Sequence, residues 1–179
     1  MKVRVLIFGA CLIATTTAWA GAQGNHQASP EQTHFSAEDV TLKKPVPVPN
    51  DVLALLKAEK LVRDALENKN VPDGNVPVSW FSASAVHLSS RPVADLVVRA
   101  EPPLAGANID YFWIFRKTGA GHELVLGAPA HDLEIRTHRS NGYREIEMSA
   151  ETASTFHSVL FRFNGKRYVV HREKTEPIK

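Results

Sequence analysis

The sequence predicts an α+β fold in which one amphipathic helix packs on a meandering antiparallel sheet of about six to eight strands. First, residues 50–68 repeat apolar side chains with the spacing of a helix. Second, almost all of the chain after residue 76 consists of short runs of strand-forming residues. Third, the sequences Thr118–Gly121, Asn141-Gly142 and Asn164-Gly165 separate successive runs in the way that hairpin turns do.

Residues 1–20 are typical of a cleavable signal peptide. Lys2 and Arg4 precede an apolar stretch, and Ala18-Trp19-Ala20 supplies the small residues that signal peptidase recognises. Because the stretch is too short to span a membrane, we expect an exported protein, periplasmic or secreted, with no membrane span after cleavage. The alternatives are an N-terminal core helix, for which no cap is present, and a lipoprotein signal ending at Cys11, which needs a longer apolar run before the cysteine.

Removal of this peptide changes the composition of the protein. The sequence has 21 Lys and Arg against 19 Asp and Glu, and the loss of Lys2 and Arg4 leaves 19 of each sign. The positive charge of the full sequence is therefore no indication of nucleic-acid binding, and we expect no nucleic-acid partner. Cys11 is the only cysteine, so disulfides, thiol nucleophiles and cysteine metal ligands are not expected either.

Residues 21–49 are expected to form a flexible linker that contains proline. The segment is polar, and Pro45, Pro47 and Pro49 alternate with valine, which favours an extended backbone. The alternative is a ligand for a proline-recognition domain. Residues 50–179 then form a single α+β domain, which is long enough for its own hydrophobic core.

The helix is expected over residues 50–68. Asn50 can cap its N-terminus, and Asp51 in the first turn interacts favourably with the helix dipole. Val52, Leu55 and Val62 belong to its apolar face. The turn-rich sequence 68–74 ends the helix, which we expect to cover one face of the sheet.

The strands begin near Trp80-Phe81, with a less regular run at 85–88 and a clear short strand at 95–100. Residues 111–115, Tyr-Phe-Trp-Ile-Phe, form the densest apolar run. A strand that is apolar on both sides is usually central and covered on both faces, so we expect a core strand. An exposed aromatic strip that binds a partner is the alternative.

The three turns predict the registers of three hairpins. Each register places residues of similar character or opposite charge across from one another, as cross-strand pairs prefer. The predicted pairs are Arg116 with Glu123 and Trp113 with Leu126 in the first hairpin, Arg136 with Glu147 and His138 with Glu145 in the second, and Phe161 with Tyr168 in the third.

His131 and Asp132 are the candidate residues for catalysis. A buried histidine beside a carboxylate is suited to acid–base chemistry, although neighbouring residues of a strand point to opposite faces. The sequence contains 8 histidines, but none has the spacing of a metal-ligand motif. We therefore expect no metal and no other cofactor.

Four arginines near the hairpin turns are the candidate binding residues. The predicted registers place Arg139 opposite Arg144 and Arg162 opposite Arg167. Such like-charge pairs are unfavourable unless a ligand uses them. The hypothesis is a surface for an anionic partner, and solvated turns without a role are the alternative.

Several blocks of the C-terminal half resemble small exported bacterial proteins of unassigned function. The blocks are Asp95–Arg99, Phe112–Arg116, Glu123–Leu126, Ala130–Ile135, Asn141–Ile146 and Phe161–Tyr168. The resemblance implies a bacterial periplasmic or secreted setting, and it brings no catalytic residues. More remotely, the β-rich fold without a recognisable catalytic site is similar to that of periplasmic lysozyme inhibitors, which insert a loop into an enzyme cleft. No motif matching that loop stands out here.

The function expected from these observations is an exported, non-catalytic binding or inhibitor-type module. Its partner would be a protein or an anionic component of the envelope or the extracellular space. One alternative is a small envelope hydrolase that uses His131 and Asp132. The other is a structural envelope protein whose linker spaces the domain from other components.

Overall fold

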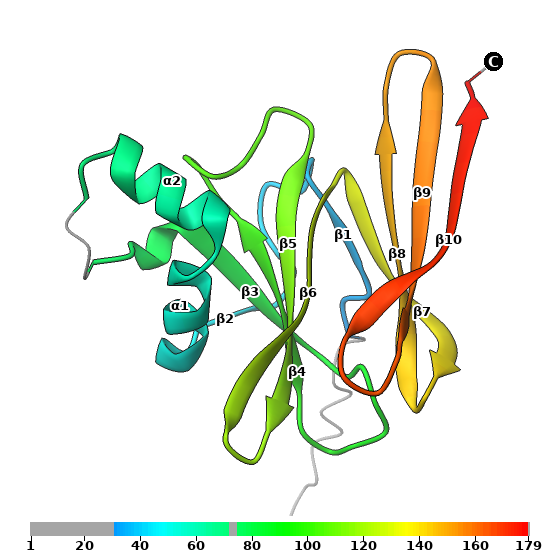
Figure 1. Cartoon of the computed structure of the whole chain (residues 1–179), viewed down its shortest axis with the longest axis horizontal. Helices are drawn as coiled ribbons and strands as arrows, with labels where there is room; N and C mark the ends of the chain where they lie inside the picture. The colour runs from blue at the N-terminus through cyan, green and yellow to red at the C-terminus, as the bar shows by residue number, and fades with distance from the viewer. Residues whose placement is uncertain (1–30, 72–74, 179) are drawn as a thin grey trace, which may run out of the picture.

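The computed structural model describes residues 31–71 and 75–178 (Figure 1). The signal peptide expected at residues 1–20 and the first third of the expected linker lie outside the described residues. In the described part of the chain no helix is long and apolar enough to cross a membrane.

The described residues form an α+β fold with two five-stranded antiparallel sheets rather than the single sheet predicted. Their strand orders are β2-β3-β4-β5-β6 and β1-β7-β8-β9-β10. The chain changes sheet between β6 and β7, where only His131 separates the two strands. The elements are β1 (His34–Ser36), β2 (Pro45–Val46), α1 (Asn50–Lys57), α2 (Lys60–Asn68), a 3-10 turn (Val78–Trp80), β3 (Phe81–Val86), β4 (Asp95–Ala100), β5 (Asp110–Thr118), β6 (Gly121–Ala130), β7 (Asp132–Ser140), β8 (Tyr143–Glu151), β9 (Thr155–Phe163) and β10 (Tyr168–Pro177).

Strands β4 and β5 form the centre of the molecule and are buried on both faces. Phe112 and Ile114 pack toward the β1-β7-β8-β9-β10 sheet, while Trp113 and Phe115 pack toward the helices. All four side chains are fully buried, which confirms that this run is core. The molecule therefore has three layers, with the helices, the β2–β6 sheet and the second sheet in that order (Figure 1).

The predicted single helix is broken into α1 and α2 at Ala58 and Glu59, where Glu59 has an extended backbone (φ −69°, ψ 137°). In a continuous helix Val62 would lie about 120° around the axis from Leu56. The break allows both side chains to be fully buried against the sheet. It also places the Glu59 carboxylate 3.3 Å from Nε1 of Trp113, which gives this buried indole an acceptor. Pro49, not Asn50, occupies the N-cap position.

The first hairpin has the predicted pairing of Arg116 with Glu123, but a bulge follows it. The bulge places Gly127 opposite Trp113, where Leu126 was predicted. A side chain at residue 127 would meet Trp113 Cδ1 at 3.2 Å and Tyr111 Cε1 at 3.3 Å. The packing of these two rings against the backbone of β6 therefore favours glycine.

The second hairpin has the predicted two-residue turn, with positive φ at Asn141 and Gly142. Arg139 pairs with Arg144 as predicted, but a bulge at residues 136–138 then shifts the register by two. The predicted Cα pairs of Arg136 with Glu147 and of His138 with Glu145 are therefore wrong. The predicted side-chain contacts nevertheless form. Arg136 donates to Glu147 at 2.7 Å, and His138 Nδ1 lies 3.0 Å from Glu145, because side chains on a bulged strand can lean toward their partners.

The third hairpin has a four-residue loop instead of the predicted two-residue turn. The Asn164 carboxamide oxygen accepts the backbone N–H groups of Lys166 and Arg167, both at 2.9 Å. Tyr168 consequently pairs with Phe163, not with Phe161. Arg162 pairs with Val169, so the predicted opposition of Arg162 and Arg167 is wrong.

Residues 31–49, the described part of the expected linker, are joined to both sheets. β1 pairs with β7 and β2 pairs with β3, and Phe35 is fully buried. The buried Arg99 guanidinium holds this segment. It donates to the carbonyl oxygens of Ser36 at 3.1 Å and Asp39 at 2.7 Å, and to the carboxylate of Glu101 at 2.8 Å.

We predict that Arg99→Ala lowers the free energy of unfolding by about 3–5 kcal/mol, because it leaves the carboxylate of Glu101 and two carbonyl groups without their buried partner. Arg136→Ala is the matched control. Its side chain is 45% exposed in pairs with Glu134 and Glu147, so about 1 kcal/mol or less should be lost. Urea denaturation measures both, and similar losses in the two variants would contradict this role of Arg99.

Candidate functional site

Three hairpin turns and the β3–β4 loop lie at one end of the molecule (Figure 1). We call this surface the hairpin-tip end and define it as residues 87–94, 116–123, 139–145 and 162–167. Its parts are joined by contacts between them. Arg91 Nη1 donates to the Lys117 carbonyl at 2.8 Å, and Asn141 Nδ2 donates to the Phe163 carbonyl at 2.6 Å. Segments distant in sequence therefore form one continuous surface.

The hairpin-tip end is strongly basic. Eight Lys and Arg residues lie in its four segments, against the two acidic residues Glu123 and Glu145. Two carboxylates from outside the segments, Asp95 and Glu31, also pair with arginines there. An excess of positive charge remains. The basic residues are Arg91, Arg116, Lys117, Arg139, Arg144, Arg162, Lys166 and Arg167.

Arg139 and Arg144 are directly opposite one another, as the sequence predicted. Arg139 Nη1 donates to the carbonyls of Leu88 at 3.0 Å and Gly142 at 3.3 Å. Arg144 donates to the carbonyls of Ile135 and Arg136, each at 2.8 Å. Carbonyl groups fix the position of a guanidinium without cancelling its charge. Arg139 is therefore a fixed cation, whereas Arg144 also lies 3.4 Å from the carboxylate of Glu31.

Arg162 and Arg167 differ in their surroundings. Arg162 Nε lies 2.5 Å from Oε1 of Glu145, a buried carboxylate. Burial opposes the ionisation of Glu145, but hydrogen bonds from Ser140 and Arg162 outweigh it and lower the pKa of this carboxyl. Arg162 is thus an ion-paired residue, whereas Arg167 is exposed at the mouth of a groove.

Two aromatic side chains of the hairpin-tip end contact each other and two of its arginines. Tyr143 and Phe163 stack with their ring centres 4.1 Å apart. The guanidinium of Arg91 lies 5.7 Å from the centre of the Tyr143 ring, and that of Arg116 lies 5.5 Å from Phe163, which are cation–π distances. Sequence reasoning missed Arg91 and Arg116, because their neighbours here are distant in the chain.

A groove of about 500 Å³ separates the edge strands β6 and β10. Arg167 and Glu59 supply its charged groups. Val169 and Val170 are 36% and 51% exposed on the β10 side, because β6 does not cover them. The remaining lining residues are Leu124, Val125, Leu126, Gly127, Phe161 and Tyr168.

His131 and Asp132 lie at the opposite end of the molecule, at the corner where the chain changes sheet. The prediction that they point to opposite faces is wrong, because His131 belongs to neither strand. Its Nδ1 atom lies 3.0 Å from Asp132, and its Nε2 atom lies 3.5 Å from Glu38. These contacts, the hydrogen bond to Asp132 first, raise the pKa of His131.

The hydroxyl group of Ser36 is also close to His131 and Asp132, and it interacts with the Asp132 carboxylate. Burial opposes the ionisation of Asp132, and hydrogen bonds from His131 and Ser36 outweigh it, so the pKa of this carboxyl is lowered. The Ser36 hydroxyl also accepts the Glu38 N–H at 3.3 Å. A serine nucleophile would instead have to donate its proton to the imidazole, and no such hydrogen bond occurs among the described residues. A groove of about 320 Å³ is lined by Asp132 and His34 but not by His131.

No group of three His, Cys, Asp or Glu side chains suited to a metal ion occurs within residues 31–71 and 75–178. The histidine His157 on β9 instead has a hydroxyl neighbour, because its Nδ1 atom lies 2.9 Å from the hydroxyl of Thr175.

The fold is a three-layer α+β arrangement. Both faces of its central sheet are covered, and a basic surface lies at one end of the strands. No protein-family model matches the chain, and no curated protein or solved structure matches it. The resemblance to small exported bacterial proteins stays an expectation from sequence.

We predict that His131 makes stability depend on pH. Because its folded pKa lies above its ordinary value of 6.5, its contribution is fully present below about pH 6.5 and is lost as the pH rises through the folded pKa. The difference in unfolding free energy between the protein and His131→Gln should therefore be largest in mild acid and shrink toward alkaline pH.

Thermal or urea denaturation at a series of pH values measures this difference. His171→Gln, an exposed histidine on β10 replaced in the same way, is the matched control. A His131→Gln difference that stays constant with pH, or grows in alkali, would contradict the assignment.

Proposed function

We propose that this chain is an exported, non-catalytic binding module that engages an acidic partner protein through the hairpin-tip end. The observation that carries the proposal is that four separate segments lie at one end of the molecule (Figure 1) and together contain eight basic residues against two acidic ones. The segments come together through the meander of the strands. Such a surface attracts an acidic partner over a distance and orients it before contact.

The charge of the opposite end supports a directed electrostatic interaction. Residues 36–39, 101–110, 131–132 and 151–155 contain no Lys or Arg. Their acidic residues are Glu38, Asp39, Glu101, Asp110, Asp132 and Glu151. These segments lie at the end of the molecule opposite the hairpin tips (Figure 1). Among their carboxylates, those of Glu101 and Asp110 pair with the buried Arg99.

A protein partner is favoured over an anionic polymer or lipid by the kind of basic residue present. Six of the eight basic residues are arginines, and Arg139 and Arg144 are already fixed by carbonyl groups. Arginine and tyrosine are enriched at protein–protein interfaces, where lysine is depleted. Fixed side chains also reduce the entropy that binding must overcome.

A hydrolase that uses His131 and Asp132 is less well supported. Both imidazole nitrogens face carboxylates, and the nearby Ser36 contacts the acid. A serine nucleophile instead requires contact with the imidazole, together with oxyanion donors.

We predict that Lys166→Glu combined with Arg167→Glu weakens binding of the partner at least tenfold. Both side chains are exposed at the β9–β10 loop, so the fold should be unaffected. The partner is captured from bacterial envelope extract on the immobilised protein, identified, and its affinity is measured at low and high salt. Binding should weaken as salt is added.

The matched control is Arg63→Glu combined with Lys69→Glu on the helical layer, which should bind as the unmodified protein does. Equal affinity of the Lys166 and Arg167 variant would contradict the proposal. Capture of an anionic lipid or polymer with no acidic protein would also overturn it.

A further inference from the structure

We propose that the groove between β6 and β10 binds the acidic segment 38–40 of a second copy of this chain, so that the protein associates head to tail. This inference goes beyond the proposed function, because the groove lies beside the hairpin-tip end and its occupant is the chain itself. It rests on two complementary surfaces at opposite ends of one molecule.

The first surface is an exposed apolar side chain that directly follows two acidic residues. Val40 is 92% exposed and directly follows Glu38 and Asp39. The turn that carries it is fixed, because the Asp39 carbonyl accepts a hydrogen bond from Arg99 at 2.7 Å and the Asp39 carboxylate accepts one from the Ser36 N–H at 3.2 Å. An exposed valine on a fixed turn is suited to insertion into a partner.

A second exposed apolar residue lies close to the same turn. Ile109 is 42% exposed and precedes Asp110, whose carboxylate is 3.7 Å from Nε of Arg99. Arg99 thus contacts both acidic segments, so Val40 and Ile109 each adjoin a residue that this guanidinium contacts. Each is an apolar residue beside a carboxylate.

The second surface places one exposed cation, Arg167, beside exposed apolar side chains. The groove of about 500 Å³ exposes Val169 and Val170 beside Arg167. Grooves of this size accept a few side chains. Its Glu59 carboxylate already accepts the Trp113 indole N–H, and its charge directs an acidic segment toward Arg167 instead.

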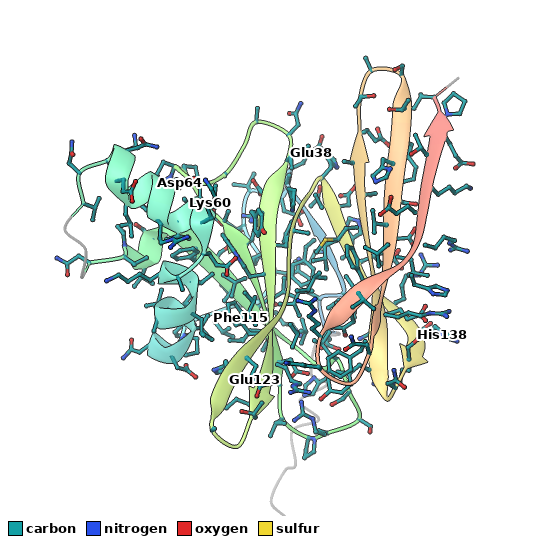
Figure 2. The ribbon with its side chains drawn as sticks, viewed as in Figure 1. Glu38, Lys60, Asp64, Phe115, Glu123 and His138 are labelled. Atoms are coloured by element: carbon teal, nitrogen blue, oxygen red, sulfur yellow. The ribbon has the colours of Figure 1, made fainter. Side chains whose placement is uncertain are left out.

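The segment of one molecule cannot occupy its own groove. Figure 2 shows Glu38 at the end opposite to Glu123, which lies in the hairpin at the basic end. The contact must therefore form between copies. Because it joins two different surfaces, it is heterologous and can continue from one molecule to the next.

Side-chain insertion fits the groove better than addition of a strand. β10 has a bulge at His171 and carries Lys174 and Pro177, and β6 has a bulge near Val125 and carries Pro129. Bulges, lysine and proline all protect sheet edges against pairing with another strand.

The test is sedimentation equilibrium of the purified protein over a wide range of concentration, at low and high salt. We expect weak association that decreases with salt. Val40→Ser and Arg167→Glu should each raise the dissociation constant at least tenfold, whereas Val78→Ser, which alters another valine that is 53% exposed, should leave it unchanged.

A charge exchange makes the test specific. Glu38→Arg and Arg167→Glu should each fail to associate alone, and their mixture should associate, because each then offers the partner that the other requires. A protein that stays monomeric throughout, or association that Val40→Ser and Arg167→Glu leave unchanged, would overturn the inference. If the unmodified protein self-associates as expected but captures no acidic protein from envelope extract, only the proposed function would be overturned.

Discussion

Strands β4 and β5 are apolar on both faces, and the arrangement of every other layer depends on covering them. Each large side chain of β5 that is removed from water contributes about 1.5–3 kcal/mol. The helices cover Trp113 and Phe115, and the second sheet covers Phe112 and Ile114. With both faces covered, only the ends and edges of the central sheet remain for binding, and these are where the charged surfaces and the groove lie.

The pattern of burial could be predicted from the sequence, because a run such as 111–115 has no polar face to expose. The break between α1 and α2 could have been found from the same pattern. Leu56 and Val62 are six residues apart, a spacing at which one straight helix cannot bury both. In the first two hairpins the registers could be predicted only between the turn and the first bulge. Each bulge costs little locally and is selected by packing elsewhere, as Gly127 is by the rings of Tyr111 and Trp113.

The candidate site could be predicted only in part, because tertiary packing decides which segments come together. Turn sequences indicate Arg139 and Arg144 without knowledge of the tertiary structure. The contributions of Arg91 and Arg116 depend on which turns share an end of the molecule. In a meander every second turn lies at the same end of the molecule. Once the strands are counted correctly, the turns that share the basic end are therefore known. The wrong loop length at Asn164 placed Arg162 and Arg167 opposite one another, whereas Arg162 pairs with Glu145 and Arg167 is exposed.

The central claim is that a partner binds at the hairpin-tip end and not at the acidic corner around His131. Hydrogen–deuterium exchange of the protein alone and with its captured partner tests it most directly. The account predicts that the partner slows exchange in residues 87–94, 139–145 and 162–170, with residues 131–134 and 151–155 unchanged. Protection confined to the acidic end, with the hairpin tips unaffected, would contradict it.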